Sequence, residues 1–438
     1  MKEYPKVLVI AHNPFSNMQN NGKTLASFFK GWPKDKIAQL YFTYDNVEND
    51  VCDNFYRITD LDVLKNIVKK NNVGCQHNQK DFLNDNKKEN LHKNKIYTII
   101  RDLFKKRYPF MYCIRNICWN ITKPWKIDVI NKWIDEFNPD IVFFQSSNVY
   151  TVFKFVKYIC DSREIPLIME TTDDYVTSKF SLSPFFWIDH IEMVKWYRKL
   201  VNYSKCVFTI GDKMKDEYSK RFGGNYKVAM NCIDIEGKVK EYTAESGKKV
   251  KFLYAGNLGL NRWKTLEKLG KALAEIKAEN GIDCFCEIYS IEKPDNKVLN
   301  DINIEGTMKY MGKLNSEELL EKRNCSDVLV HVESFDKKNI YITRLSISTK
   351  IPEYLAAKRC ILAIGPEKIA SMQYIKDNDV GITITDMNMT SMKKKLLQVI
   401  TSPELRIEYS KRTQNLLRER HDPEKNKNNV QDEIIKVV

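Results

Sequence analysis

The residues best suited to chemistry lie in one segment, residues 348–366, which reads STKIPEYLAAKRCILAIGP. Two hydroxyls and a cation, Ser348, Thr349 and Lys350, precede a predicted helix that carries Glu353, and the apolar run after it predicts a buried strand. Helix-start N–H groups, hydroxyls and a lysine suit a diphosphate, and a carboxylate can accept two hydrogen bonds from a sugar diol. The segment predicts a nucleotide-sugar site. The alternative is an ordinary amphipathic helix with a surface glutamate.

A second phosphate-binding pattern lies near the start of the chain, in NMQNNGKTL, residues 17–25. It matches the P-loop pattern at Gly22, Lys23 and Thr24, but Asn17 stands where the first glycine is needed. The residues HNPFS separate it from the preceding strand, and the strand over 139–145 ends in a glutamine where a magnesium-binding acid is expected. A P-loop nucleotide hydrolase is therefore the alternative function.

Three further polar residues follow predicted strands. His12 comes directly after the first strand, and it is either a base at a ligand site or a hydrogen-bonded structural histidine. Asp173 and Asp174 follow a strand over 166–171. They either point toward the ligand-binding edge of the sheet or cap a turn, a role in which aspartate is common.

Composition indicates a large globular enzyme. The chain has 438 residues, 43% of them hydrophobic and 29% charged, so we expect two domains. No apolar run approaches the roughly 18 residues that a membrane span needs, and no signal peptide is visible, which predicts a cytoplasmic protein. The 11 cysteines form no C-x-x-C pair, and no metal-ligand cluster is visible.

The formal net charge of +14 is concentrated in residues 87–126, where eleven Lys or Arg residues stand against two acids. Ile96, Ile100 and Leu103 share one helical face there, and Lys95, Arg101, Lys105 and Lys106 surround it. This pattern predicts contact with an anionic membrane surface; the alternative is a face packed on its own domain. No nucleic-acid partner is expected, because no RNA- or DNA-binding motif accompanies the charge.

The elements that must position these residues form two α/β series. Strands are predicted over residues 6–11, 37–42, 139–145, 166–171 and 206–211, and again over 250–256, 284–290, 308–314, 327–334, 360–365 and 381–386. Helices are predicted between most of them, which gives two Rossmann-like domains with parallel sheets. We expect domains over 1–240, with a basic insertion near 71–126, and over 241–415, followed by a C-terminal helix over 416–438.

Three motifs in the second series together carry a family resemblance: YAGNLGLNRWKTLEKL, HVESFD and the STKIPEYLAAKRCILAIGPE segment, in that order. The chain resembles the GT-B glycosyltransferases, in particular the large nucleotide-sugar-dependent group (glycosyl transferases group 1, family 4-like) of bacterial capsule and O-antigen clusters. The resemblance implies a cleft between the two domains and a C-terminal helix that returns toward the N-terminal domain. It also implies transfer from a nucleoside-diphosphate sugar to a glycan or lipid-linked glycan at the inner membrane face, without a metal or other cofactor.

The resemblance also implies roles for individual residues. Glu353 matches the ribose-binding glutamate, Gly256 and Gly259 match the glycine loop beside the diphosphate, and Arg262 or Lys264 matches a phosphate-binding cation. Lys350, Ser348 and Thr349 would contact the phosphate or nucleotide, Ser334 and Phe335 the donor sugar, and His12, Gly22, Lys23, Thr24, Asp173 and Asp174 the acceptor side of the cleft. We count Glu353, Lys350, Arg262, Lys264 and Asp174 as the candidate catalytic residues.

One position departs from the family pattern. Retaining members carry two glutamates spaced E-x7-E, and Leu345 stands at the first of these positions. Glu333 is too far upstream to fill that spacing without an insertion. Stereochemistry is therefore not predicted, and a non-catalytic scaffold of GT-B shape stays an alternative.

Overall fold

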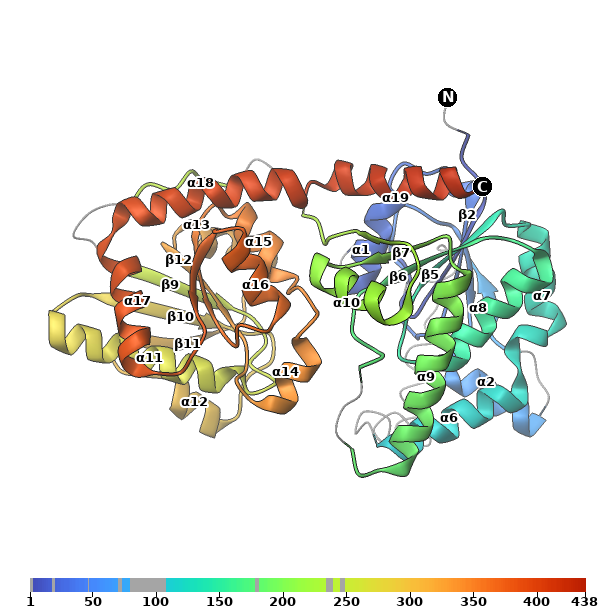
Figure 1. Cartoon of the computed structure of the whole chain (residues 1–438), viewed down its shortest axis with the longest axis horizontal. Helices are drawn as coiled ribbons and strands as arrows, with labels where there is room; N and C mark the ends of the chain where they lie inside the picture. The colour runs from blue at the N-terminus through green and yellow to red at the C-terminus, as the bar shows by residue number, and fades with distance from the viewer. Residues whose placement is uncertain are drawn as a thin grey trace. The chain divides into compact units, whose positions relative to one another are not determined.

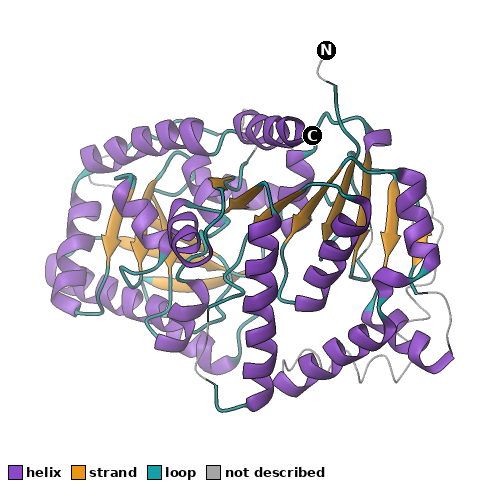
Figure 2. Cartoon of the chain, turned by 45° about the vertical axis from the view of Figure 1, so that its right-hand side comes forward, coloured by secondary structure: helices purple, strands orange, loops and turns teal. Residues whose placement is uncertain are grey.

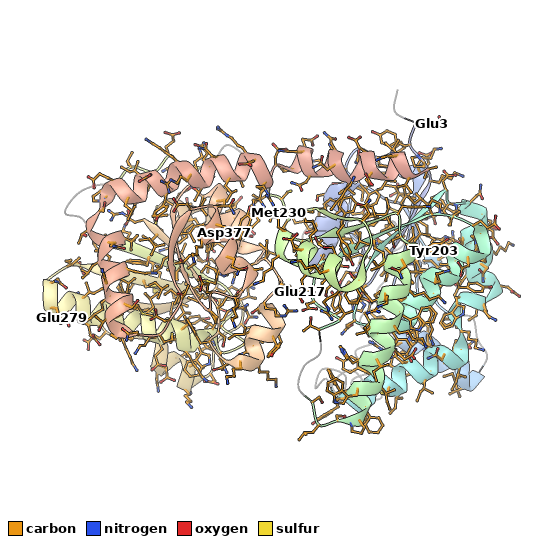
Figure 3. All side chains as sticks on the ribbon, viewed as in Figure 1. Glu3, Tyr203, Glu217, Met230, Glu279 and Asp377 are labelled. Carbon is orange, nitrogen blue, oxygen red and sulfur yellow. The ribbon has the colours of Figure 1, made fainter. Side chains whose placement is uncertain are left out.

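The computed structural model describes residues 3–17, 20–45, 47–69, 73–78, 108–177, 181–233, 239–244 and 249–438. The chain packs as two units (Figure 1). The first unit comprises Met1–Ala229 and Glu424–Val438, and the second comprises Met230–Pro423. Met230, labelled in Figure 3, begins the second unit. The predicted basic helix around Ile96 lies outside the described residues.

The first unit is built on an eight-stranded sheet with the strand order β4-β3-β2-β1-β5-β6-β7-β8. Its strands pair in parallel except for β4, which runs antiparallel to β3. The strands are β1 (Val7–Ala11), β2 (Ile37–Tyr41), β3 (Asn54–Arg57), β4 (Cys75–His77), β5 (Ile141–Gln145), β6 (Leu167–Thr171), β7 (Cys206–Thr209) and β8 (Tyr226–Val228).

Helices cover this sheet, as Figure 2 shows in purple. They are α1 (Asn20–Phe28), α2 (Asp60–Lys69), α6 (Pro109–Thr122), α7 (Asp128–Phe137), α8 (Tyr150–Arg163), α9 (Pro184–Tyr203), α10 (Asp212–Phe222) and the C-terminal α19 (Pro423–Val437). In α19, Val430 and Ile434 are fully buried in the core that also contains residues of β1 and α1. The Gln431 side chain donates hydrogen bonds to the carbonyls of Phe28 and Lys30, so α19 is an integral part of the first unit.

The second unit has a six-stranded, wholly parallel sheet with the order β11-β10-β9-β12-β13-β14. The strands are β9 (Val250–Ala255), β10 (Cys284–Tyr289), β11 (Met308–Gly312), β12 (Val328–Val332), β13 (Cys360–Ile364) and β14 (Gly381–Ile384). Counted from its first strand, this is the doubly wound order 3-2-1-4-5-6, whose direction reverses between β9 and β12. A ligand site is expected where the carboxyl ends of these two strands meet.

Both faces of the second sheet are covered, which explains why its strands are nearly continuous apolar runs. One face packs on α11 (Arg262–Asn280), α12 (Asn296–Ile302) and α17 (Met389–Thr401), and the core there includes Phe252, Leu266 and Leu396. The remaining helices are α13 (Ser316–Asn324), α14 (Lys337–Thr343), α15 (Lys350–Ala356), α16 (Ala370–Asp377) and α18 (Pro403–Arg420). The predicted α/β class with two parallel-sheet domains is confirmed.

Within the described part of the chain, no helix is both long enough and apolar enough to cross a membrane.

Candidate functional site

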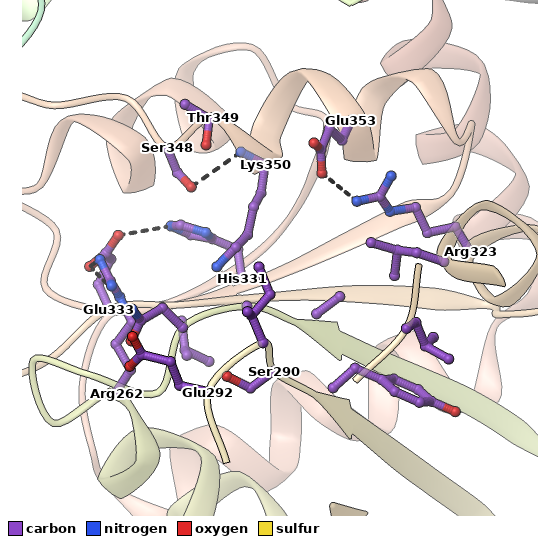
Figure 4. Close-up of a pocket in the computed structure, with 18 of the residues that line it drawn as sticks. Arg262, Ser290, Glu292, Arg323, His331, Glu333, Ser348, Thr349, Lys350 and Glu353 are labelled. Carbon is purple, nitrogen blue, oxygen red and sulfur yellow. Dashed lines mark hydrogen bonds and ion pairs between the residues drawn. The ribbon is translucent and has the colours of Figure 1, made fainter. Parts of the chain in front are cut away.

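A cavity of about 570 Å³ opens in the second unit at the reversal point of its sheet, between the carboxyl ends of β9 and β12. It continues past the end of β10 toward α13, and α15 supplies another wall (Figure 4). This volume lies in the range of small-molecule sites, about 300–1,000 Å³. Residues that carry charge in its lining are Arg262, Glu292, Arg323, Glu333, Lys350 and Glu353.

Lys350 is the cation at the centre of this cavity. Its Nζ lies 5.3 Å from the centroid of the Tyr254 ring. Burial, and secondly the nearby Arg262 guanidinium, lower the pKa of Lys350 from 10.5 to about 8, so the ammonium is mostly charged at neutral pH. Among the described residues no carboxylate or carbonyl bonds to its Nζ. A half-buried ammonium that contacts an aromatic ring but no carboxylate favours an anion as ligand.

Gly256, directly after β9, makes room for this lysine. A Cβ at Gly256 would lie 1.9 Å from Lys350 Nζ and 2.6 Å from its Cε. A side chain at position 256 would therefore take the place of the ammonium and displace the flexible end of Lys350. The glycine lets Lys350 keep its position beside the Tyr254 ring.

Arg262, the first residue of α11, is paired with Glu333 at the end of β12. The guanidinium donates to Glu333 Oε2 from Nη2 at 3.0 Å and from Nε at 3.3 Å. The Glu333 residue is only 3% exposed, and burial raises the pKa of its carboxyl against the opposing effect of Arg262. The pair fixes the arginine at the mouth of the glycine loop, beside Lys350.

His331 lies two residues before Glu333 on the same strand and therefore on the same face. Its Nε2 is 3.4 Å from Glu333 Oε1, which is beyond a good hydrogen bond. Burial, then Lys350 and Arg262, lower the pKa of His331 to about 3. The imidazole is therefore neutral at physiological pH, and the contact with Glu333 is not an ion pair.

Glu353 and Arg323 form the second charged pair in the cavity. Arg323 Nη2 of α13 donates to Glu353 Oε2 of α15. The Glu353 side chain is 36% exposed, whereas that of Arg323 is 9% exposed. One carboxylate oxygen is held by the arginine while the other can accept from a ligand, so Arg323 fixes the orientation of Glu353.

The end of the cavity toward α13 is apolar. Ile291, Leu314 and Leu319 line it together with Tyr289, the last residue of β10. The Tyr289 hydroxyl donates to Glu287 at 2.8 Å, which anchors the ring. The cavity is therefore lined by charged groups of both signs at the reversal point of the sheet and by apolar side chains beside β10 and β11.

The start of α15 contributes less than the sequence suggested. The helix has seven residues, and the Lys350 N–H is already directed at Ser348 Oγ, at 3.4 Å. Thr349, at the N-cap, makes no side-chain capping bond. The positive charge available to a ligand comes from side chains rather than from helix-start N–H groups.

The structure gathers six of the residues predicted from the sequence in this one cavity: Gly256, Arg262, Ser348, Thr349, Lys350 and Glu353. Four others of the second unit do not line it. Lys264 is paired with Asp336 at 3.5 Å, and Gly259 lines a smaller adjoining cavity of about 230 Å³. Ser334 Oγ accepts bonds from Asp336 N and Asn339 Nδ2, and Phe335 packs on the core.

The remaining predicted residues lie in the first unit. His12 follows β1 and is exposed, and Gly22, Lys23 and Thr24 lie in α1. A Cβ at Gly22 would lie 2.3 Å from the Pro14 carbonyl oxygen, so this glycine serves local packing.

The two neighbouring acids of the first unit make local hydrogen bonds. Asp174 Oδ1 accepts from the Tyr218 hydroxyl at 2.7 Å and from Thr177 N at 3.0 Å. Asp173 accepts from the Tyr175 hydroxyl at 3.3 Å. These are bonds of the kind expected for the turn-capping alternative.

Sequence reasoning missed three residues of the cavity as participants: Arg323, His331 and Glu333. The alternation H-V-E at the end of a predicted strand was the available signal for the last two, since it puts both on one face. Leu345, at the position of the first family glutamate, is fully buried in the core. The cavity has a buried carboxylate at another position instead, that of Glu333 at the end of β12.

Within the described ranges, no three His, Cys, Asp or Glu residues are grouped so that they could hold a metal ion.

Comparison with solved structures identifies the fold. A sucrose-phosphate synthase from Thermosynechococcus elongatus superposes with a TM-score of 0.61 at 9% identity, over 98% of both chains. A trehalose-6-phosphate protein from E. coli bound with UDP-2-fluoro glucose gives 0.60 at 11% identity, over 99% of both. HepE from Anabaena, in complex with UDP, gives 0.60 at 11%, over 98% of this chain and 100% of its own.

No protein-family model matches the sequence, and no curated protein matches it either. At such low identity the likeness establishes the fold, and these neighbours are GT-B glycosyltransferases. The chain has the GT-B fold.

Proposed function

We propose that this chain is a glycosyltransferase that moves a sugar from a nucleoside-diphosphate sugar to a hydroxyl acceptor. The observation that carries the proposal is the cavity at the reversal point of the second sheet, with an unpaired ammonium, Lys350, at its centre. A fixed arginine and a fixed carboxylate, Arg262 and Glu353, flank it on either side.

The lining suggests how a donor would lie. Its diphosphate would bind beside Lys350, whose ammonium contacts the Tyr254 ring, and beside Arg262, which Glu333 holds in place. Its ribose diol would donate to Glu353, whose orientation Arg323 fixes. The base would occupy the apolar end near Leu314 and Leu319.

The chemistry then follows from charge. Departure of the nucleoside diphosphate develops negative charge on its phosphates. Cations that are already in place stabilise this charge without reorganising, which is often the largest single contribution to catalysis. Lys350 remains protonated once a diphosphate is bound, because the anion favours the charged form.

The finer assignment rests on the sequence resemblance. We propose that the acceptor is a growing glycan or lipid-linked glycan of a bacterial surface polysaccharide and that transfer takes place in the cytoplasm, at the inner face of the membrane. No metal or other cofactor is part of this proposal.

Release of nucleoside diphosphate from a panel of nucleotide sugars tests the transfer activity. Arg262→Met should lower turnover about a hundredfold, the scale seen when one fixed stabiliser of transition-state charge is lost. Lys264→Met is the matched control, because Lys264 is paired with Asp336 outside the cavity, and it should change turnover less than about threefold. Equal losses in both variants would contradict the placement of the diphosphate, and binding without any release would favour the non-catalytic scaffold.

A further inference from the structure

The first unit presents a row of exposed apolar side chains on α6. Phe110, Ile114, Ile117 and Ile121 follow one another at intervals of four, three and four residues, so they share one face of the helix. Each is between 41% and 63% exposed. The opposite face is buried at Trp119, whose Nε1 donates to Asp60 of α2, so α6 is firmly seated and its apolar row faces outward.

The N-terminal half of α9 adds a second apolar row beside the first. Phe185, Ile188 and Ile191 are between 47% and 62% exposed, and Leu182, just before the helix, is 89% exposed. The two helices are in contact, as Figure 1 also shows. Cys113 Sγ of α6 donates to the carbonyl of Phe185, and Asn116 donates to Asp189. Together these rows form what we call the α6/α9 surface: Phe110, Ile114, Ile117, Ile121, Leu182, Phe185, Ile188 and Ile191.

The exposed charges near this surface are positive. Residues 108–126 contain no acid, and Lys123 and Lys126 at the end of α6 are exposed, as are Arg198 and Lys199 of α9. Arg115 does not contribute, because two of its guanidinium nitrogens are buried. The acids of α9 are engaged within the protein: Asp189 accepts from Asn116, and Glu192 pairs with Lys195. A ligand bound to this surface would therefore contact apolar and basic side chains, and α6 would present no acidic side chain to it.

We propose that the α6/α9 surface binds the chain to an anionic lipid bilayer, with the two helices lying in the headgroup region. Large exposed apolar surfaces on soluble proteins usually mark interaction sites, and eight large apolar side chains are exposed on or just before these two contacting helices. Apolar side chains on one helix face with basic residues at the flanks fit a bilayer interface that is apolar below and negatively charged at its surface. This inference concerns the first unit and does not depend on the proposed sugar transfer.

Co-sedimentation with vesicles of phosphatidylcholine alone, or of phosphatidylcholine and phosphatidylglycerol in equal parts, tests the inference. The full chain should bind the anionic vesicles and release as salt rises. Ile117→Glu together with Ile188→Glu should lower the vesicle partition coefficient at least about tenfold, because each places a charge where apolar burial is needed. Met311→Glu, at an exposed apolar position of β11 in the second unit, should leave binding unchanged.

An unchanged thermal unfolding temperature without ligand establishes that the double variant is folded. Its nucleoside-diphosphate binding, measured separately, distinguishes a failure of this inference from a failure of the proposed function. Three results would overturn the inference. One is that the wild type ignores anionic vesicles even at low salt. Another is that the double variant binds them as the wild type does. The third is that the double substitution converts a dimer into a monomer in light scattering without changing vesicle binding, which would assign the surface to a second copy of the chain.

Discussion

At the scale of single residues, the enclosed ammonium of Lys350 dominates the cavity. Its pKa is lowered to about 8 by burial and by Arg262, so raising the pH through about 8 removes the charge that the proposed diphosphate needs. Phosphate groups have already lost their last proton at this pH, since their second pKa is about 6. The affinity for a nucleoside diphosphate should therefore be nearly constant between about pH 7 and pH 8 and fall above that range, by up to about tenfold per pH unit.

Calorimetric titrations across this pH range measure the effect. The Lys350→Met variant should bind weakly at every pH and show no such fall. The same slope in wild type and variant would mean that another group titrates and that Lys350 does not contact the phosphates.

The pair of Glu353 and Arg323 allows a second test. If a Glu353 variant loses activity, the cause is either the lost ribose contact or the unpaired Arg323. Glu353→Gln removes the charged acceptor of the ribose diol, and a charge-assisted bond contributes about 1.5–3 kcal/mol, so kcat/KM should fall at least tenfold. If Glu353 served only to neutralise Arg323, adding Arg323→Met would restore activity. We expect the double variant Glu353→Gln/Arg323→Met to remain impaired, as measured by steady-state kinetics; recovery would refute the ribose assignment.

Part of the cavity could be predicted from the sequence and part could not, for a reason visible in these residues. Lys350 and Glu353 belong to one continuous motif, whose order already places them on one element. Arg323 comes from a different helix, and its partner Glu353 is thirty residues away, so no local spacing reveals the pair. Glu333 is not predicted either, because the family spacing points to position 345, where a buried leucine stands.

At the scale of elements, the glycine loop after β9 and the start of α15 must fit together. Gly256→Ala places a methyl group 1.9 Å from Lys350 Nζ, at the end of a flexible side chain, so the ammonium must move aside. We expect a loss of nucleoside-diphosphate binding, measured by calorimetry, with little change in the thermal unfolding temperature. In a Lys350→Ala background the same glycine substitution should weaken binding no further. A large additional loss in that background would show that the glycine substitution does not act through the lysine.

The buried parallel strands were predictable because short, continuous apolar runs bounded by polar turns are typical of strands that are covered on both faces. All eleven predicted strands are present. The structure adds β3, β4 and β8, which have only three or four residues each, too few to show a pattern. From the sequence, α6 is predicted only as part of a basic insertion, because its apolar residues face both the core and solvent and leave no clear amphipathic pattern.

At the scale of the whole molecule, two parallel-sheet units share the chain, and the proposed donor site lies wholly in the second. The phosphate-loop pattern at Gly22, Lys23 and Thr24 lies in the first. The proposed function therefore includes the claim that the nucleotide binds to the second unit. Ligand binding tests this claim directly. A ligand at a hundredfold excess over its dissociation constant stabilises the fold by about 2.7 kcal/mol.

The most direct measurement is the thermal unfolding of the full chain with nucleoside diphosphates, nucleotide sugars and ATP, each with and without magnesium. Lys350→Met and Lys23→Met are compared in the same panel. The account predicts that a nucleoside diphosphate and its sugar conjugate stabilise the protein without magnesium, that Lys350→Met abolishes the shift and that Lys23→Met preserves it. Stabilisation by ATP alone, dependent on magnesium and lost in Lys23→Met but not in Lys350→Met, would contradict it and place the nucleotide in the first unit.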